Sequence, residues 1–263
     1  MLVFVLCLYD IILDMYVYTL TMDLIVATSR GGKISSYLNK PKMPVPIKTI
    51  SAPGASFSEL QAITIRELNK INRKSQNSKT HVYVMGGIND ITKLNKGTGY
   101  CEAVVRDRDA DETTSRIMAQ IKLIESTIKE KGAIPIFCTI PPMHIESYNL
   151  AMLHGRKRRT THLRHQQHYP HMQKHIETAC TEINKQIWLT NTKNSMKTPK
   201  TTRHIFRSPG ANRAPRFTHD NKLEGGFYDG LHPDWLLATK WATELLDAAI
   251  ENRYGVPPSS HPK

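Results

Sequence analysis

Short apolar segments that alternate with helical patterns predict a doubly wound α/β fold, with a mainly five-stranded parallel sheet between layers of helices. Three observations support this prediction. Five brief, β-branched runs are bounded by Gly, Pro or Asn, as buried parallel strands are. Apolar residues recur at helical spacing between them. The chain has 263 residues, of which 40% are hydrophobic, so one domain with a large core is expected.

The elements follow in a regular order along the chain. The predicted strands are residues 23–28, 47–52, 81–86, 133–140 and 186–190. The predicted helices each carry one apolar stripe, which runs through Leu60, Ile63, Leu68 and Ile71 in the first, Ile117, Ile121, Ile124 and Ile128 in the second, and Leu237, Trp241, Leu245 and Ala248 in the last. We therefore expect the domain to span residues 23–254, with a tail at 255–263.

The apolar N-terminal stretch 1–22 is expected to be an extension ahead of the domain, with Met22 as the working start. The positive n-region of a signal peptide is missing, because no Lys or Arg precedes Arg30. Asp10 and Asp14 would lie inside a membrane span, where each acid costs roughly 2.5–3.5 kcal/mol. We expect no transmembrane span and favour an intracellular protein; a secreted one, with residues 1–22 as a signal peptide, is the alternative.

The net charge of +13 is concentrated in two segments. Residues 155–175 carry six Lys or Arg and no acid, and residues 193–222 carry eight against one acid, so the rest of the chain is neutral. These segments are predicted to be basic insertions: solvated surface loops, or a binding surface for nucleic acid or anionic lipid. The candidate polyanion-binding residues are Arg156, Lys157, Arg158 and Arg159.

Cysteine and histidine usage predicts no metal and no cofactor. The four cysteines form no CxxC pair, which argues against a zinc ribbon and a disulfide scaffold. A run of histidines leaves a metal site as an alternative, but without a neighbouring acid or cysteine a solvated basic helix face is the favoured interpretation. The run consists of His162, His165, His168, His171 and His175.

Chemistry-bearing residues gather where the predicted strands end. Ligands of such sheets bind at the carboxyl ends of the strands. Ser29 follows the first strand, Gly54 the second and Asn89 the third, while Asp229 and His232 precede the last helix. These five residues are therefore expected at one edge of the sheet.

Each of these residue types suits acyl transfer. A serine hydroxyl needs a base, and His232 is the available one; Asp229, three residues earlier, can orient the imidazole and stabilise its charged form. An oxyanion needs fixed donors, for which the candidates are the N–H groups of Ser29 and Gly54 and the side-chain amide of Asn89. The pattern thus predicts a serine nucleophile, a histidine base and an oxyanion hole.

This ordered set resembles the SGNH, or GDSL-like, hydrolase superfamily. The segment Gly87-Ile88-Asn89-Asp90 is similar to the GxND block of that family, Asp229-Gly230-Leu231-His232 to its DxxH block, and Gly54 takes the place of its second-block glycine. The resemblance implies a flavodoxin-like three-layer fold and a catalytic Ser29, Asp229 and His232, with Ser29, Gly54 and Asn89 around the oxyanion. The basic insertions resemble those of SGNH-type domains in retroelement proteins. This analogy does not identify a substrate.

The first block departs from the family pattern. The family usually has Gly-Asp-Ser, whereas this chain has Ala27-Thr28-Ser29, so the acid that commonly fixes the turn is absent. One alternative for Ser29 is that it merely caps the next helix. Two functions follow: a serine esterase that acts on a small acyl ester, which is favoured, or a catalytically silent SGNH fold whose basic loops bind nucleic acid or anionic lipid.

Overall fold

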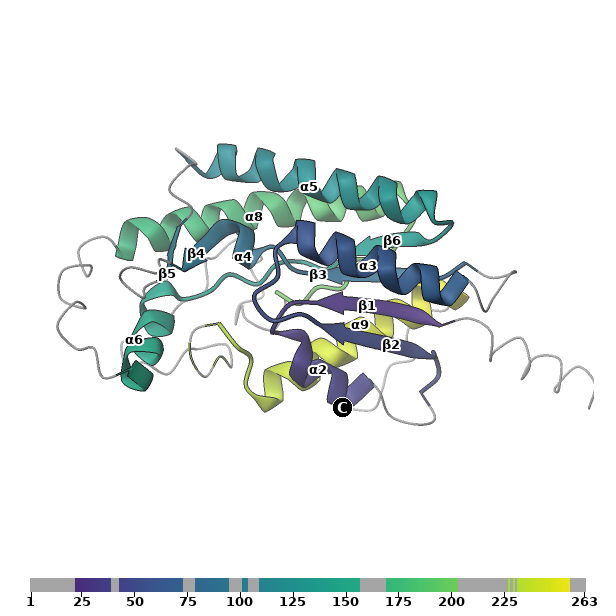
Figure 1. The fold of residues 1–263 in the computed structure, drawn as a ribbon, viewed down its shortest axis with the longest axis horizontal. Coiled ribbons are helices and arrows are strands. Elements are labelled where there is room, and N and C mark those ends of the chain that lie inside the picture. The colour runs from purple at the N-terminus through teal and green to yellow at the C-terminus, as the bar shows by residue number, and fades with distance from the viewer. Residues whose placement is uncertain are drawn as a thin grey trace, which may run out of the picture.

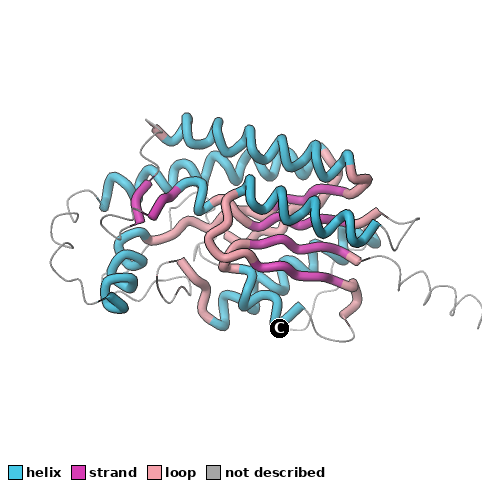
Figure 2. The backbone as a smooth tube through the Cα atoms, viewed as in Figure 1, coloured by secondary structure: helices cyan, strands magenta, loops and turns pink. Residues whose placement is uncertain are grey.

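A computed structural model describes residues 22–38, 43–72, 79–94, 101–103, 109–156, 169–202, 227, 229 and 231–255. Its centre is a four-stranded parallel sheet with helices on both faces (Figures 1 and 2). In spatial order the strands are β2 (Ile47–Ser51), β1 (Asp23–Ala27), β3 (His81–Met85) and β6 (Ile134–Phe137). The expected three-layer α/β fold is therefore confirmed.

Strand side chains alternate between two apolar cores, one on each face of the sheet. Leu24 and Val26 of β1 belong to the core that also contains the buried faces of α3 (Phe57–Asn72), α5 (Ala110–Glu130) and α8 (Tyr169–Lys193). Ile25 and Ala27 belong to the core under α2 (Gly31–Leu38) and α9 (Trp235–Tyr254). This alternation follows from the two-residue period of a strand, and it explains why β1 is buried along its whole length.

The predicted strand at 186–190 is wrong, because these residues lie inside helix α8. The buried residues of α8 recur every three or four positions, whereas Trp188 and Leu189 are 49% and 45% exposed. A five-residue apolar run does not by itself distinguish a strand from one stretch of an amphipathic helix. No Gly or Pro interrupts the chain between Pro170 and Pro199, so the helix continues through the run, and the parallel sheet has four strands in the described part of the chain rather than five.

Small elements surround the carboxyl ends of the strands. A one-turn helix, α4 (Ile88–Ile91), leads directly into β4 (Thr92–Leu94), which pairs antiparallel with β5 (Cys101–Ala103). Helix α6 (Ile145–Arg156) follows β6. These elements lie beyond the strand ends and lengthen the molecule on that side (Figure 1).

Most of the two basic insertions falls outside the described residues. Arg156 is the last residue of α6, and Lys157, Arg158 and Arg159 are not among the residues described. The first basic segment ends inside α8, and the second begins at its last residue, Lys193. Among the helices that are described, none is both long and apolar enough to cross a membrane.

Glu67 gives the stability of this fold a specific dependence on pH. Its carboxylate accepts hydrogen bonds from Lys48 of β2 and from Lys70, each at 2.8 Å, and from Arg66 at 3.2 Å. The bonds from Lys48 and Lys70 dominate, and they lower the pKa of Glu67 from its ordinary 4.5 to about 2. The ionised carboxylate therefore stabilises the folded state fully above pH 4.5, and this contribution disappears as the pH falls through about 2.

We predict that Glu67→Gln lowers stability at pH 7 by about 1 kcal/mol, or about 2–4 °C in Tm, because the three cations are partly exposed and such pairs are weak. The difference from the unchanged protein should shrink between pH 4.5 and pH 2. Thermal unfolding followed by circular dichroism across this range measures it, with Glu130→Gln at the exposed end of α5 as the control. A difference that does not change with pH would contradict the assignment.

Candidate active site

The turn that follows β1 is held by backbone contacts and by one serine hydroxyl from β2. The Thr28 N–H donates to the Met85 carbonyl at 3.1 Å, and the Thr28 carbonyl accepts from the Gly31 N–H at 2.9 Å and from Ser51 Oγ at 3.0 Å. Thr28 itself is buried, and Ser29 is half-buried. The Ser51 hydroxyl thus supports the turn from the neighbouring strand.

The loop before α9 places a histidine against this turn. His232 Nε2 lies 3.1 Å from Ser29 Oγ, and His232 Nδ1 lies 2.6 Å from Asp229 Oδ2. The other Asp229 oxygen accepts from the N–H groups of Leu231 at 3.0 Å and His232 at 2.7 Å. This backbone turn fixes the aspartate relative to the imidazole, and Asp234 then caps α9 through the Leu237 N–H at 2.7 Å.

Electrostatics assign the proton positions in this group. Burial alone would raise the pKa of Asp229, but the hydrogen bonds from the His232 ring and from the two backbone N–H groups outweigh it, so the pKa lies below its ordinary value. An ionised carboxylate only accepts hydrogen bonds, so His232 Nδ1 must donate to it. A neutral His232 therefore presents its unprotonated Nε2 to the Ser29 hydroxyl, which is the arrangement that activates a serine.

Asn89, in α4, and Gly54, in the loop between β2 and α3, lie at the same edge of the sheet. Asn89 Nδ2 donates to the Ala55 carbonyl at 2.9 Å, directly beside Gly54. Gly54 has a φ of +77°, a backbone conformation that favours glycine. Asp90 accepts from the Phe57 N–H at 3.0 Å, so it caps α3 and ties α4 to that helix.

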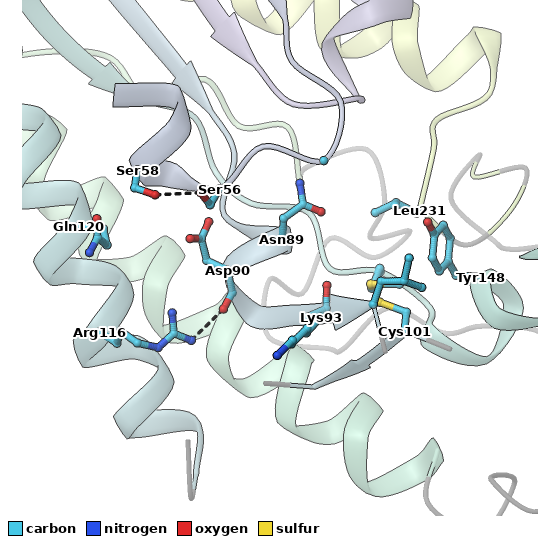
Figure 3. A pocket seen from close by; sticks show the side chains of 14 residues that line it. Ser56, Ser58, Asn89, Asp90, Lys93, Cys101, Arg116, Gln120, Tyr148 and Leu231 are labelled. Atoms are coloured by element: carbon cyan, nitrogen blue, oxygen red, sulfur yellow. Dashed lines mark hydrogen bonds between the residues drawn. The ribbon is translucent and has the colours of Figure 1, made fainter. Parts of the chain in front are cut away.

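A cleft of about 1200 Å³ opens beside these residues (Figure 3). Its walls come from the start of α3, from α4, β4 and α5, and from Tyr148 of α6. Gly54, Asn89 and Leu231, the residue before His232, are among the residues that line it, and the Tyr148 ring lies 6.4 Å from the His232 ring. The cleft therefore adjoins the His232 loop through Leu231 and Tyr148.

Sequence reasoning missed three supporting residues: Ser51, Arg30 and Lys33. Arg30 Nε and Lys33 Nζ each donate to a backbone carbonyl of the His232 loop, at 3.1 and 3.0 Å. No local pattern could have identified Ser51, because its partner is 23 residues away in sequence. Arg30 is visible in the sequence directly after Ser29, but nothing in the sequence predicts that its side chain is buried.

The histidine run divides between described and undescribed parts of the chain. His162, His165 and His168 lie outside the described residues. His175 Nε2 lies 3.0 Å from Thr113 Oγ1, between α8 and α5. Within the residues that are described, no group of three His, Cys, Asp or Glu side chains is placed to hold a metal ion.

Comparison with solved structures shows the fold. The chain is similar to a candidate acylhydrolase from Bacteroides fragilis, with 14% identity over 89% of this chain and 87% of that one and a TM-score of 0.50. A GDSL-like lipase from Bacteroides thetaiotaomicron matches with 14% identity, 89% of each chain and a TM-score of 0.48. An acetyl xylan esterase matches with 15% identity, 88% of this chain, all of that chain and a TM-score of 0.40.

Searches by sequence alone found no match, either to a protein-family model or to a curated protein. The likeness is therefore structural. The four-stranded parallel sheet and its helical layers thus share the α/β fold of the first of these structures.

Gly87 allows Asn89 to reach its position, and we predict that Gly87→Ala is more damaging than an ordinary glycine substitution. Its φ is +103°, and an added Cβ would lie 2.4 Å from Ile140 Cδ1 and 2.8 Å from the Phe57 ring. Backbone strain costs about 1–2 kcal/mol and the clash about 1–3 kcal/mol more. Denaturant unfolding should show a loss of about 3 kcal/mol.

Gly132→Ala is the matched control. Gly132 also has a positive φ, of +74°, but nothing lies within 4 Å of its added Cβ. Its substitution should therefore cost only the backbone strain, about 1–2 kcal/mol. Equal losses for the two variants would show that the space around Gly87 does not matter.

Proposed function

We propose that this protein is a serine hydrolase of acyl esters and that residues 23–254 form its hydrolase domain. In this proposal Ser29 is the nucleophile, His232 the general base and Asp229 the residue that orients the imidazole. The contact that carries the proposal is the 3.1 Å approach of His232 Nε2 to Ser29 Oγ, combined with the 2.6 Å contact of Asp229 on the opposite ring nitrogen. Both distances lie within the hydrogen-bond range expected for a nucleophile, its base and an orienting carboxylate.

The proposed reaction has two steps, each with a proton moved by His232. In the first, Ser29 Oγ attacks the ester carbonyl carbon while Nε2 takes the hydroxyl proton; the tetrahedral intermediate then expels the alcohol, which receives that proton. In the second, Nε2 takes a proton from water, whose oxygen attacks the acyl-enzyme, and Ser29 recovers its proton as the acid leaves. The ionised Asp229 stabilises the imidazolium that forms in both steps.

The oxyanion of both tetrahedral intermediates requires donors that are fixed in advance. We assign this role to the N–H groups of Ser29 and Gly54 and to the side-chain amide of Asn89. Asn89 uses one amide hydrogen on the Ala55 carbonyl, and an amide nitrogen carries two, so a second remains for the substrate. Loss of one such donor typically costs about two to three powers of ten in rate.

The substrate in this proposal is a small acyl ester whose remaining part occupies the adjoining cleft. The cleft has a mixed lining, with hydroxyl and amide groups from Ser56, Ser58 and Gln120 and apolar groups from Leu94 and Met143. The name of the first similar structure, an acylhydrolase, agrees with ester chemistry. Binding of nucleic acid or anionic lipid by the basic insertions stays a prediction.

We predict that Ser29→Ala and His232→Ala each reduce hydrolysis of p-nitrophenyl acetate by about three orders of magnitude or more, and that the double variant is no worse than either. Residues that act as one unit give losses of this non-additive kind. Steady-state rates, together with labelling of Ser29 by a fluorophosphonate probe, measure the effect.

Ser147→Ala is the control, because Ser147 Oγ also contacts a histidine, His144 Nδ1, at 2.6 Å. That pair lies at the start of α6, where His144 Nδ1 also accepts from the Ser147 N–H at 3.3 Å, so its role is helix capping. The control should keep its activity. Unchanged turnover in Ser29→Ala would eliminate the proposed mechanism.

A further inference from the structure

Two cations from the segment just after Ser29 reach the loop that carries His232. Arg30 Nε donates to the Leu231 carbonyl at 3.1 Å, and Lys33 Nζ donates to the Pro233 carbonyl at 3.0 Å. These carbonyls belong to the residues immediately before and after His232. The backbone on both sides of the histidine is therefore bonded to the segment that begins at the nucleophile.

Arg30 is built into the protein interior. Arg30 is only 3% exposed, and its Nη1 donates to the Pro141 carbonyl at 2.6 Å. The guanidinium carbon lies 5.6 Å from the Phe227 ring centroid and 5.9 Å from that of Trp241. Burial lowers the pKa of Arg30 to about 10, so it remains charged at neutral pH.

A buried cation of this kind is costly, and here its forked shape matters. One guanidinium bonds the Leu231 carbonyl through one nitrogen and the Pro141 carbonyl, which follows β6, through another. A lysine ammonium carries the same charge on a single nitrogen and cannot reproduce a planar fork. Lys33 differs, since it is half-buried and its bond to the Pro233 carbonyl uses a single nitrogen, so that an arginine can also make it.

Ser29 and His232 are 203 residues apart in the chain, so their separation depends on contacts such as these. We propose that Arg30 and Lys33 form a clamp on the His232 loop and are positioning residues that set the distance between the Ser29 hydroxyl and the imidazole. The inference rests on the proposed function, because it assigns these residues to the same reaction. A displacement of about 1 Å at such a site can cost about a hundredfold in rate.

The test compares two substitutions at each position. Arg30→Met and Arg30→Lys should both slow fluorophosphonate labelling of Ser29 and lower kcat, by about 100-fold and at least about 10-fold respectively, with KM within about 2-fold. Lys33→Met should lower kcat by about 3-fold, and Lys33→Arg should restore it. Lys240→Met, an exposed lysine on α9, is the control and should behave as the unchanged protein.

Hydrogen exchange of the 229–237 segment separates positioning from general stability. Exchange there should quicken in Arg30→Met while exchange in α5 stays unchanged. If this segment exchanges at the same rate in Arg30→Met and in the unchanged protein, the clamp does not exist, whatever the activity of the variant. Faster exchange with unchanged kcat and labelling would overturn the positioning role, as would full activity in Arg30→Lys. If the unchanged protein is not labelled at Ser29, the proposed function fails and with it the positioning role, whereas the exchange result still decides whether the clamp exists.

Discussion

The chain reversal after β1 is the constraint on which the rest of the site depends. β1 lies between β2 and β3 in the sheet, so the turn that follows it can be bonded from both neighbours. Met85 supplies a carbonyl from the end of β3, and Ser51 supplies a hydroxyl from the end of β2. Once Thr28 is fixed in this way, Ser29 lies at the strand edge with its hydroxyl directed at the His232 ring.

Elements from distant parts of the chain then converge on this turn. The His232 loop is bonded to it through Arg30 and Lys33, and α9 begins directly after that loop. On the other side, Asp90 ties α4 to the start of α3, and Asn89 of α4 is bonded to the Ala55 carbonyl beside Gly54. The site thus combines short-range turns, which fix each functional group, with a few long-range contacts that fix the groups relative to one another.

The fold was largely predictable from sequence because its information is local. Strands such as β1 and β3 are short β-branched runs, and α5 shows its buried face as isoleucines at steps of four, three and four. The run at 186–190 misled because its periodicity is visible only when Ile176, Cys180 and Ile183 are considered with it. The error moved residues 186–190 from the sheet to a helical layer and left the predicted α/β class unchanged.

The candidate site was predictable in its main residues but not in its supports. Ser29, Asn89 and His232 follow or precede regular elements, so topology alone gathers them at one edge. Because position 28 carries no acid, the sequence does not show what holds the Ser29 turn and the His232 loop in place. Ser51 bonds the Thr28 carbonyl 23 residues away, and Arg30 bonds the Leu231 carbonyl 201 residues away. Neither contact has a sequence signature, because its two partners are far apart in the chain and no local pattern marks them.

The most direct measurement is to trap the acyl-enzyme. Brief exposure to p-nitrophenyl acetate followed by acid quenching and peptide mass spectrometry would locate the acetyl group. The account predicts a single acetyl group on Ser29, formed at the rate of the first burst of p-nitrophenol and lost on further incubation. Acetylation confined to surface lysines, or a burst with Ser29 unmodified, would contradict it.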